Sequence, residues 1–459
     1  LKPYFTQSSA GVQTRYASPS SSLCRIAMLD TACILLLYTI QGAVQGIAFG
    51  TLPLLMRRNP ASTDLHQSTF SLIGYPFSLK FLLAPVIDAF YIKRLGRRES
   101  WILPLQLLST LLLAALANRI SPMLDASPPE VANLTMVMFA LVAATAAGDI
   151  ATDAWAAGKM SDSSASVCQA VGLTLGSEGS STVFFLLMGR GLLDIAKLFQ
   201  LMSTLGFVVI GCFILQMLQK GSSGASGSDL KEAEVEPEPE GIRDVFSRSL
   251  SLIRGSANVR WWLAFSVLIP ILGGHRSLVS VRYQAAGFSP EIFAEYDLYL
   301  LPVSLVVMWL GGKIAQSRYI LTCHSWVCVL KGLVDVVTLL HFRRTREMGE
   351  SAVQDSTMRL AYIVLNQLGG SLSTVLFVIS CAVNNRIAQK NPLIAGSVIT
   401  FMASMTNLGG LLPATWVPIV AEYAGIDATA IFCLASGFTV LLAFWQKLRQ
   451  LEDPEDAGW

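Results

Sequence analysis

Long apolar runs alternate with short polar segments along most of the chain, and each run is about the length of a membrane-spanning helix. Such a helix needs about 20 mostly apolar residues. Twelve segments meet this requirement: residues 27–55, 68–90, 101–117, 131–157, 165–188, 197–218, 259–283, 292–316, 319–341, 358–384, 393–423 and 428–447. The pattern therefore predicts an all-α membrane protein with 12 transmembrane helices.

The longest polar interruption, residues 219–257, contains the sequence GSSGASGSDLKEAEVEPEPEG. A Gly/Ser stretch followed by a Glu/Pro stretch cannot bury enough apolar surface to fold, so we predict a disordered cytoplasmic linker. It separates an N-terminal six-helix bundle (26–218) from a C-terminal six-helix bundle (258–448). We predict a disordered N-terminal tail at 1–25 and a C-terminal tail at 449–459. Two such halves are the layout of the major facilitator fold.

Composition and charge narrow the function classes. Apolar residues make up 53% of the chain and charged residues 14%, against roughly 25% charged in soluble domains. The net charge of +2 provides no field that would recruit nucleic acid. Lysine and arginine favour the side of both termini by about two to one, which predicts cytosolic termini, with exceptions at 57–58 and 343–346. The eight cysteines lie mostly in apolar runs without metal-site spacing, so we predict no metal.

One lysine lies inside the second predicted span, YPFSLKFLLAPVIDAF (75–90). A lysine at mid-bilayer costs about 2.5–3.5 kcal/mol on insertion scales, so Lys80 needs a partner or a function. It is either a snorkelling or ion-paired structural residue, or a cation that faces a water-filled cavity and binds an anion. We favour the cavity, because Pro76 is expected to bend the helix nearby.

Two carboxylates and an arginine-rich loop form a candidate gate. Asp149 and Asp153 in GDIATDAW are four residues apart, on one face of the fourth span. They are a proton-coupling dyad, a structural pair, or a gate network with the loop after the second span, which we favour. That loop, Asp88 followed by KRLGRR with Arg97 and Arg98, resembles in stretched form the loop that latches the inner gate of major facilitators.

Further charges lie within the C-terminal spans. Lys331 and Asp335 are spaced i, i+4 in the ninth span, for which an intrahelical ion pair is the default interpretation. Arg276, in GGHRSLVSVR, and Arg282 add positive charge along the seventh span. Asn407 precedes two glycines and a proline in the eleventh span, which we interpret as a gating helix with a polar residue near the pathway.

The first and fifth spans carry further polar and small residues. Gln41 and Gln45 either line a pathway or form interhelical hydrogen bonds, and both alternatives stay open. Glu178 is a lone acid in the fifth span that could neutralise Lys80, neutralise a C-terminal lysine or carry a proton. The small residues Gly172, Gly176 and Ser180 around it recur every fourth position, which favours close helix packing.

Three blocks resemble the acetyl-coenzyme A (acetyl-CoA) transporters of the endoplasmic reticulum membrane. They are FSLIGYPFSLKFLLAPVIDAFYIKRLGRRESWILPLQ, GDIATDAWA and NPLIAGSVITFMASMTNLGGLLPAT. The first contains the Pro-Phe-Ser-Leu-Lys motif of that family and its stretched loop. Arg282 stands where the family tends to have a lysine, whereas Leu173 replaces an expected glutamine and Glu178 has no familiar counterpart.

The resemblance implies an antiporter that imports cytosolic acetyl-CoA into the lumen in exchange for CoA, by alternating access, to supply acetylation there. It implies no catalytic residue and no cofactor, and it leaves a homodimer open. Acetyl-CoA carries a pyrophosphate and a 3′-phosphate, which lysine and arginine recognise through charge-assisted hydrogen bonds. Lys80, Arg276, Arg282 and Lys331 are the candidate cations, and Tyr75 is a candidate for stacking on adenine.

Two alternatives compete with this interpretation. The first is a permease for another solute, because the muropeptide permeases resemble this chain in the same blocks of the second and fourth spans. A polytopic membrane acyltransferase would need a catalytic histidine in an acid/base arrangement. Of the four histidines only His275 lies well within a predicted span, and no HxxxD motif follows it, so we disfavour the acyltransferase.

Overall fold

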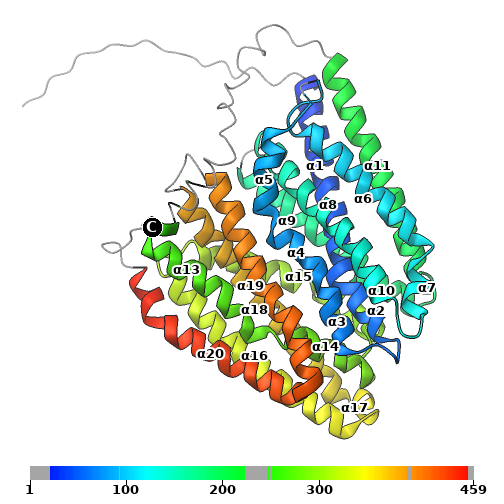
Figure 1. Ribbon diagram of the computed structural model, residues 1–459, viewed down its shortest axis with the longest axis vertical. Coiled ribbons are helices and arrows are strands. Elements are labelled where there is room, and N and C mark those ends of the chain that lie inside the picture. The colour runs from blue at the N-terminus through cyan, green and yellow to red at the C-terminus, as the bar shows by residue number, and fades with distance from the viewer. Residues whose placement is uncertain are drawn as a thin grey trace, which may run out of the picture.

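The computed structural model describes residues 21–92, 94–160, 162–222, 247, 251, 253–389 and 395–452. Within these ranges every regular element is a helix, and the helices form two bundles that lie side by side (Figure 1). The all-α fold predicted from the apolar runs is therefore confirmed. The predicted N-terminal tail and linker fall largely outside the described residues.

The N-terminal bundle contains six spans, of which the second is broken. Its helices are α1 (Ser21–Gln45), η1 (Gly46–Thr51), α2 (Leu52–Arg57), α3 (Asp64–Ser71), η2 (Leu72–Gly74), α4 (Tyr75–Ser78), α5 (Lys80–Ala89), α6 (Glu99–Ala117), α7 (Ile120–Asp125), α8 (Val131–Ala157), α9 (Asp162–Ser180), α10 (Thr182–Gly189) and α11 (Ile195–Ser222). The first span is continuous from α1 through the π-helical turn η1 into α2.

The C-terminal bundle follows the same plan. Its helices are α13 (Ala257–Leu268), η3 (Ile269–Gly273), α14 (Arg276–Ala285), α15 (Pro290–Ala315), α16 (Ile320–Met348), α17 (Ser351–Gln354), α18 (Ser356–Gln389), α19 (Ala395–Ala424) and α20 (Ile426–Gln450). Like the second span, the seventh is interrupted near its middle, at η3, where Pro270 lies in the first turn.

Ten segments of the described chain are long and apolar enough to cross a membrane. The other two predicted spans correspond to the series from α3 to α5 and to α19. The break in the second span lies at Leu79, whose φ of −106° and ψ of 7° are not helical. Pro76 in the first turn of α4 has no N–H to donate to the preceding turn, which accounts for the change from η2 to α4 ahead of this break.

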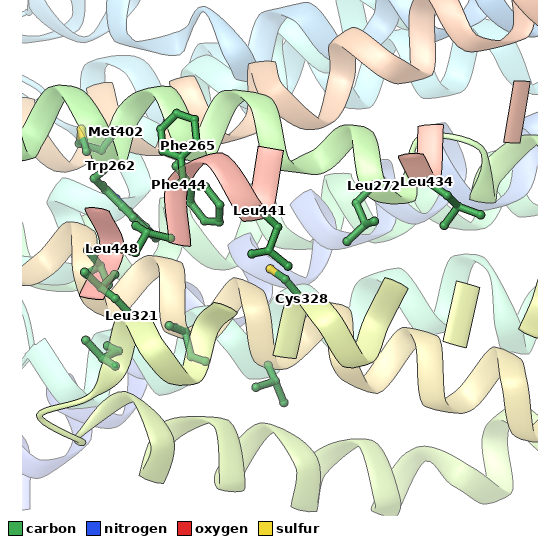
Figure 2. Packing of buried hydrophobic residues seen from close by; sticks show 14 of the residues in the cluster. Trp262, Phe265, Leu272, Leu321, Cys328, Met402, Leu434, Leu441, Phe444 and Leu448 are labelled. Carbon is green, nitrogen blue, oxygen red and sulfur yellow. The ribbon is translucent and has the colours of Figure 1, made fainter. Parts of the chain in front are cut away.

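Aromatic side chains fill the centre of the C-terminal bundle. Trp262, Phe265 and Phe444 are buried with Leu272 and Cys328 between α13, η3, α16 and α20 (Figure 2). The indole nitrogen of Trp262 donates to Asn384 Oδ1 at 2.9 Å, which satisfies its buried N–H. Within a membrane such packing supplies dispersion contacts rather than a hydrophobic driving force, so close fit between helices matters most.

The small residues of the fifth span provide that close fit in the N-terminal bundle. A β-carbon on Gly176 would overlap the carbonyl oxygen of Thr39, and one on Gly172 would meet Tyr38. The hydroxyl of Ser180 donates to the carbonyl of Ala43 at 2.9 Å. The small residues that recur every fourth position in the sequence therefore lie at the α1–α9 interface, where the two backbones are in contact.

We expect Gly176→Ala to destabilise the N-terminal bundle by about 1–3 kcal/mol, because an added methyl forces the two helices apart. Gly179→Ala is the matched control, since nothing lies within 4 Å of a β-carbon at that position of the same helix. The measurement is the fraction of detergent-solubilised protein that stays monodisperse after heating. Equal stability of the two variants would show that the α1–α9 contact is not tight.

The two bundles contact each other along α19, which lies against α3, α4 and α5, and they also meet at one end of the molecule. The alternation of spans places the α2–α3 and α14–α15 loops opposite the start of α1 and the end of α20, and we call this the far end. There α2 contacts α14, α10 contacts α15, and α3 contacts α19. In Figure 1, α2, α3, α14 and α17 lie together at this end, away from the C-terminus.

Candidate functional site

The lysine of the second span has a buried acidic partner. Lys80 is the first residue of α5, and its Nζ lies 2.9 Å from Oδ2 of Asp149 in α8. The two side chains are 13% and 7% exposed, so the pair is largely removed from solvent. This ion pair offsets the cost of placing Lys80 within the membrane.

The two carboxylates of the predicted gate have partners within the N-terminal bundle, and the gate itself stays a prediction. Asp149 pairs with Lys80, which the sequence had placed in the ligand site. Asp153 accepts hydrogen bonds from the hydroxyl of Tyr38 at 2.7 Å and from Gln169 Nε2 at 2.9 Å. Arg97 and Arg98 lie in the loop before α6, and the side chain of Asp88 is outside the described part of the chain.

A second charged cluster lies within the C-terminal bundle. The predicted i, i+4 pair of Lys331 and Asp335 is present on α16, and Asp335 is 1% exposed. Arg276, the first residue of α14, approaches the same carboxylate, with Nη1 3.4 Å from Oδ1. Arg276 also donates through Nη2 to the carbonyl of Asn366 at 3.1 Å. Two cations therefore share one buried carboxylate.

The two cations line a cavity of about 450 Å³ between η3, α14, α16, α18 and α19. Its volume falls within the roughly 300–1,000 Å³ of small-molecule sites. Ser373, Ser380 and Thr406 line it together with apolar residues. Lys80 is not among its lining residues, so the structure does not bring all the predicted cations together.

Glycine at position 369 allows Arg276 to reach this cluster. A β-carbon on Gly369 would overlap the guanidinium of Arg276, which lies against the backbone of α18. A β-carbon on the neighbouring Gly370 meets nothing within 4 Å. The position of the arginine head therefore depends on one missing methyl group, and sequence reasoning had not identified it.

The remaining predicted ligand residues are dispersed. Gln41 is buried in the N-terminal bundle and donates to Thr152 Oγ1 at 3.2 Å, which is the interhelical alternative left open from the sequence. Gln45 is half-buried near the end of α1, and Tyr75 is half-buried at the start of α4. Asn407 is exposed on α19 and does not line the cavity, although its neighbour Thr406 does.

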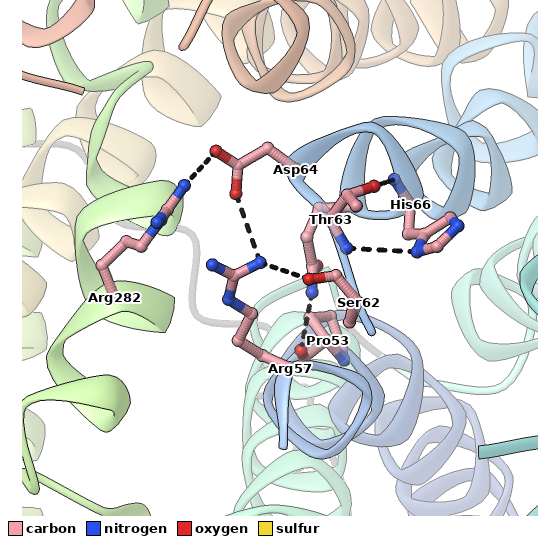
Figure 3. Close-up of polar contacts among 8 residues, drawn as sticks. Pro53, Arg57, Ser62, Thr63, Asp64, His66 and Arg282 are labelled. Atoms are coloured by element: carbon pink, nitrogen blue, oxygen red, sulfur yellow. Dashed lines mark hydrogen bonds and ion pairs between the residues drawn. The ribbon is translucent and has the colours of Figure 1, made fainter. Parts of the chain in front are cut away.

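Arg282 lies outside the cavity, at the far end of the molecule. It pairs with Asp64 of α3, whose side chain is fully buried (Figure 3). Asp64 also pairs with Arg57 of α2, at 3.5 Å. A second ion pair, Arg58 with Glu291 of α15, joins the same two bundles. These side chains hold the bundles together there, and we call them the far-end latch: Arg57, Arg58, Asp64, Arg282 and Glu291.

Asp64 and Glu291 were missed from the sequence, although a signal existed. Arg57 and Arg58 violate the lysine and arginine bias of the loops, and each now has an acidic partner. The other exception behaves in the same way: Arg343 and Arg346 both bind Asp427, at 3.0 Å. A lysine or arginine in a loop on the side opposite the termini could therefore have been used to predict an acidic partner nearby.

Comparison with known proteins finds a partial family match and a relative that is a membrane protein. Residues 31–217, nearly the whole N-terminal bundle, match the family model described as acetyl-coenzyme A transporter 1. An uncharacterized membrane protein of Saccharomyces cerevisiae is 26% identical, over 88% of this chain and 85% of the yeast protein.

Two solved structures share the fold. The nucleoside transporter NupG has a TM-score of 0.59 at 12% identity, over 91% of this chain and 98% of NupG. A bacterial homolog of the human lysosomal transporter Spinster, in an inward-facing and unoccupied conformation, has the same TM-score and identity, over 95% of this chain and 98% of its own. The chain is therefore a multi-pass membrane protein with the fold of these transporters, and its N-terminal bundle matches the family model described as acetyl-coenzyme A transporter 1.

Proposed function

We propose that this protein is a transporter that exchanges cytosolic acetyl-CoA for CoA across the endoplasmic reticulum membrane, with both termini in the cytosol and the far end in the lumen. The family match of the N-terminal bundle supports the ligand. The loop charges support the orientation, because lysine and arginine are more frequent on the side of the termini.

The observation that carries this proposal is the charge imbalance at the cavity. Arg276 and Lys331 share the single carboxylate of Asp335, which leaves one formal positive charge beside a volume of about 450 Å³. A phosphate group would compensate this charge through charge-assisted hydrogen bonds to both cations. The apolar and hydroxyl-bearing wall suits an uncharged part of the ligand, such as the acyl-pantetheine arm.

The N-terminal cluster has the opposite balance. Lys80 faces two carboxylates, Asp149 at 2.9 Å and Asp153 close enough to interact electrostatically. A polyanion is therefore attracted to the C-terminal cluster first, and we assign the phosphates to Arg276 and Lys331. The role of Lys80 as a ligand cation remains a prediction from the sequence, which a variant described in the Discussion tests.

The direct test is uptake of labelled acetyl-CoA by proteoliposomes that contain the purified full chain. We expect saturable uptake that is stimulated by CoA inside the vesicles. Unlabelled CoA should compete more strongly than dephospho-CoA, which lacks the 3′-phosphate, and pantetheine should compete least. Vesicles that ignore acetyl-CoA but take up a muropeptide would favour the permease alternative.

We expect Gly369→Ala to raise the concentration of acetyl-CoA at half-maximal uptake roughly tenfold, because the methyl displaces the Arg276 head from the cavity and one charge-assisted contact of about 1.5–3 kcal/mol is weakened. The displaced atoms are the flexible end of a side chain, so the protein should fold normally. Gly370→Ala is the matched control and should behave like the wild type. Equal kinetics of both variants would contradict the assignment of Arg276.

A further inference from the structure

The far-end latch contains a cation that the cavity site does not use. Asp64 is fully buried between two arginines, Arg57 of its own bundle and Arg282 of the other bundle (Figure 3). Arg57 also donates to the carbonyl of Ser62 at 2.8 Å, and Glu422 lies near it as an exposed acid. Arg282 is 34% exposed, and its Nε has no hydrogen-bond partner among the described residues.

The two arginines respond differently when the bundles separate at this end. Arg57 and Asp64 belong to the same bundle and stay together, so the buried carboxylate keeps a partner. Arg282 moves away with α14 and loses Asp64. Opening the far end therefore exposes a guanidinium without its carboxylate, and a guanidinium is well suited to bind phosphate in a bidentate manner.

The position of Arg282 on α14 sets how this cation relates to the cavity. Arg276 and Arg282 stand on the same helix, six residues apart, which corresponds to about 9 Å along its axis. Six residues also turn by about 240° around a helix axis, so the two side chains leave α14 on different sides: Arg276 contacts α16 and α18, whereas Arg282 contacts α3 of the other bundle. Arg282 is therefore a separate point of contact at the far end, which an anion from that side meets before it reaches the cavity.

We propose that Arg282 is a state-dependent phosphate receptor: it closes the latch by binding Asp64 in this state, and it binds the anionic ligand arriving from the far side once the latch opens. With the proposed function, on which the identity of the ligand rests, this ligand is luminal CoA. A ligand that binds only the open state shifts the population toward that state. Arrival of CoA would thus hold the far end open until the anion moves to the cavity.

The competing hypothesis is that Arg282 only closes the latch and does not bind the ligand. Two variants separate the hypotheses. Asp64→Asn and Arg282→Gln break the same ion pair from its two sides. If Arg282 only closes the latch, both variants favour the open state and shift CoA affinity in the same direction. If Arg282 is also the receptor, Asp64→Asn frees it and strengthens binding, whereas Arg282→Gln removes it and weakens binding.

The experiment measures equilibrium binding of CoA, and separately of inorganic pyrophosphate, to the full chain in nanodiscs. We expect Asp64→Asn to tighten binding several-fold, Arg282→Gln to weaken it about tenfold, and Arg282→Lys to restore most of the affinity. Glu291→Gln opens the same end without touching either residue and should act like Asp64→Asn, which covers the case that the aspartate variant does not fold.

Parallel shifts in Asp64→Asn and Arg282→Gln would overturn the proposal, as would a loss of affinity in Arg58→Gln equal to that in Arg282→Gln. Failure of the proposed function gives a distinct result, because the wild type would then neither bind CoA nor transport acetyl-CoA. In that case pyrophosphate still reports on Arg282: opposite shifts in the two variants would support the receptor, and parallel shifts would refute it.

Discussion

Lys331→Met is expected to weaken CoA binding about 100-fold, whereas Asp335→Asn should strengthen it. Without Lys331 the charges of Arg276 and Asp335 cancel, and the cavity loses its excess positive charge. One charge-assisted hydrogen bond contributes about 1.5–3 kcal/mol, and each 1.4 kcal/mol corresponds to about tenfold in affinity. Without Asp335 both cations lack their shared internal anion, and a phosphate takes its place.

The measurement is CoA binding to each variant in nanodiscs, after size-exclusion chromatography has confirmed that the protein is folded. Lys313→Met is the matched control, because this lysine is exposed on α15 of the same bundle. It should leave the affinity within about twofold of the wild type, since an exposed charge contributes little. If Lys331→Met and Asp335→Asn both weaken binding equally, the cluster is structural and the phosphates bind elsewhere.

Lys80→Met should destabilise the N-terminal bundle by about 3–5 kcal/mol, because Asp149 then lacks its ion-pair partner at 7% exposure. The double variant Lys80→Met/Asp149→Asn should recover most of this loss, since it leaves neither charge without the other. The measurement is the midpoint of thermal aggregation of the solubilised protein, compared for the wild type, both single variants and the double variant.

The same double variant tests whether Lys80 binds the ligand. If the phosphates bind at the C-terminal cluster, the folded double variant should bind CoA with an affinity close to that of the wild type. A stable double variant that has lost CoA binding would instead make Lys80 the receptor that its place within an apolar run first predicted. Failure of the double variant to regain stability would show that Lys80 and Asp149 have other essential partners.

Several local contacts could be read from spacing. The Lys331–Asp335 pair and the close packing at Gly172 and Gly176 depend on residues one helical turn apart. In a helix such residues are neighbours whatever the rest of the fold does. Once the apolar runs had fixed the helices, these contacts followed from the period of the helix alone.

The partners of the isolated charges could not be read in this way. Asp149 binds Lys80 from 69 positions away, and Asp64 binds Arg282 from 218 positions away. Which acid meets which cation depends on how helices from distant parts of the chain lie against one another. The sequence therefore suggested a central site with Lys80, Arg282 and Lys331 together, whereas the structure separates them into three clusters.

The sequence by itself determined the membrane class, the six-plus-six arrangement and the resemblance to acetyl-CoA transporters, because apolar run length and local motifs are properties of contiguous residues. Only the tertiary structure decided which cations share a carboxylate, which line the cavity and which join the bundles. The physical reason is that a buried charge takes its partner from any helix that passes close to it, and proximity between helices is a property of the assembled bundles.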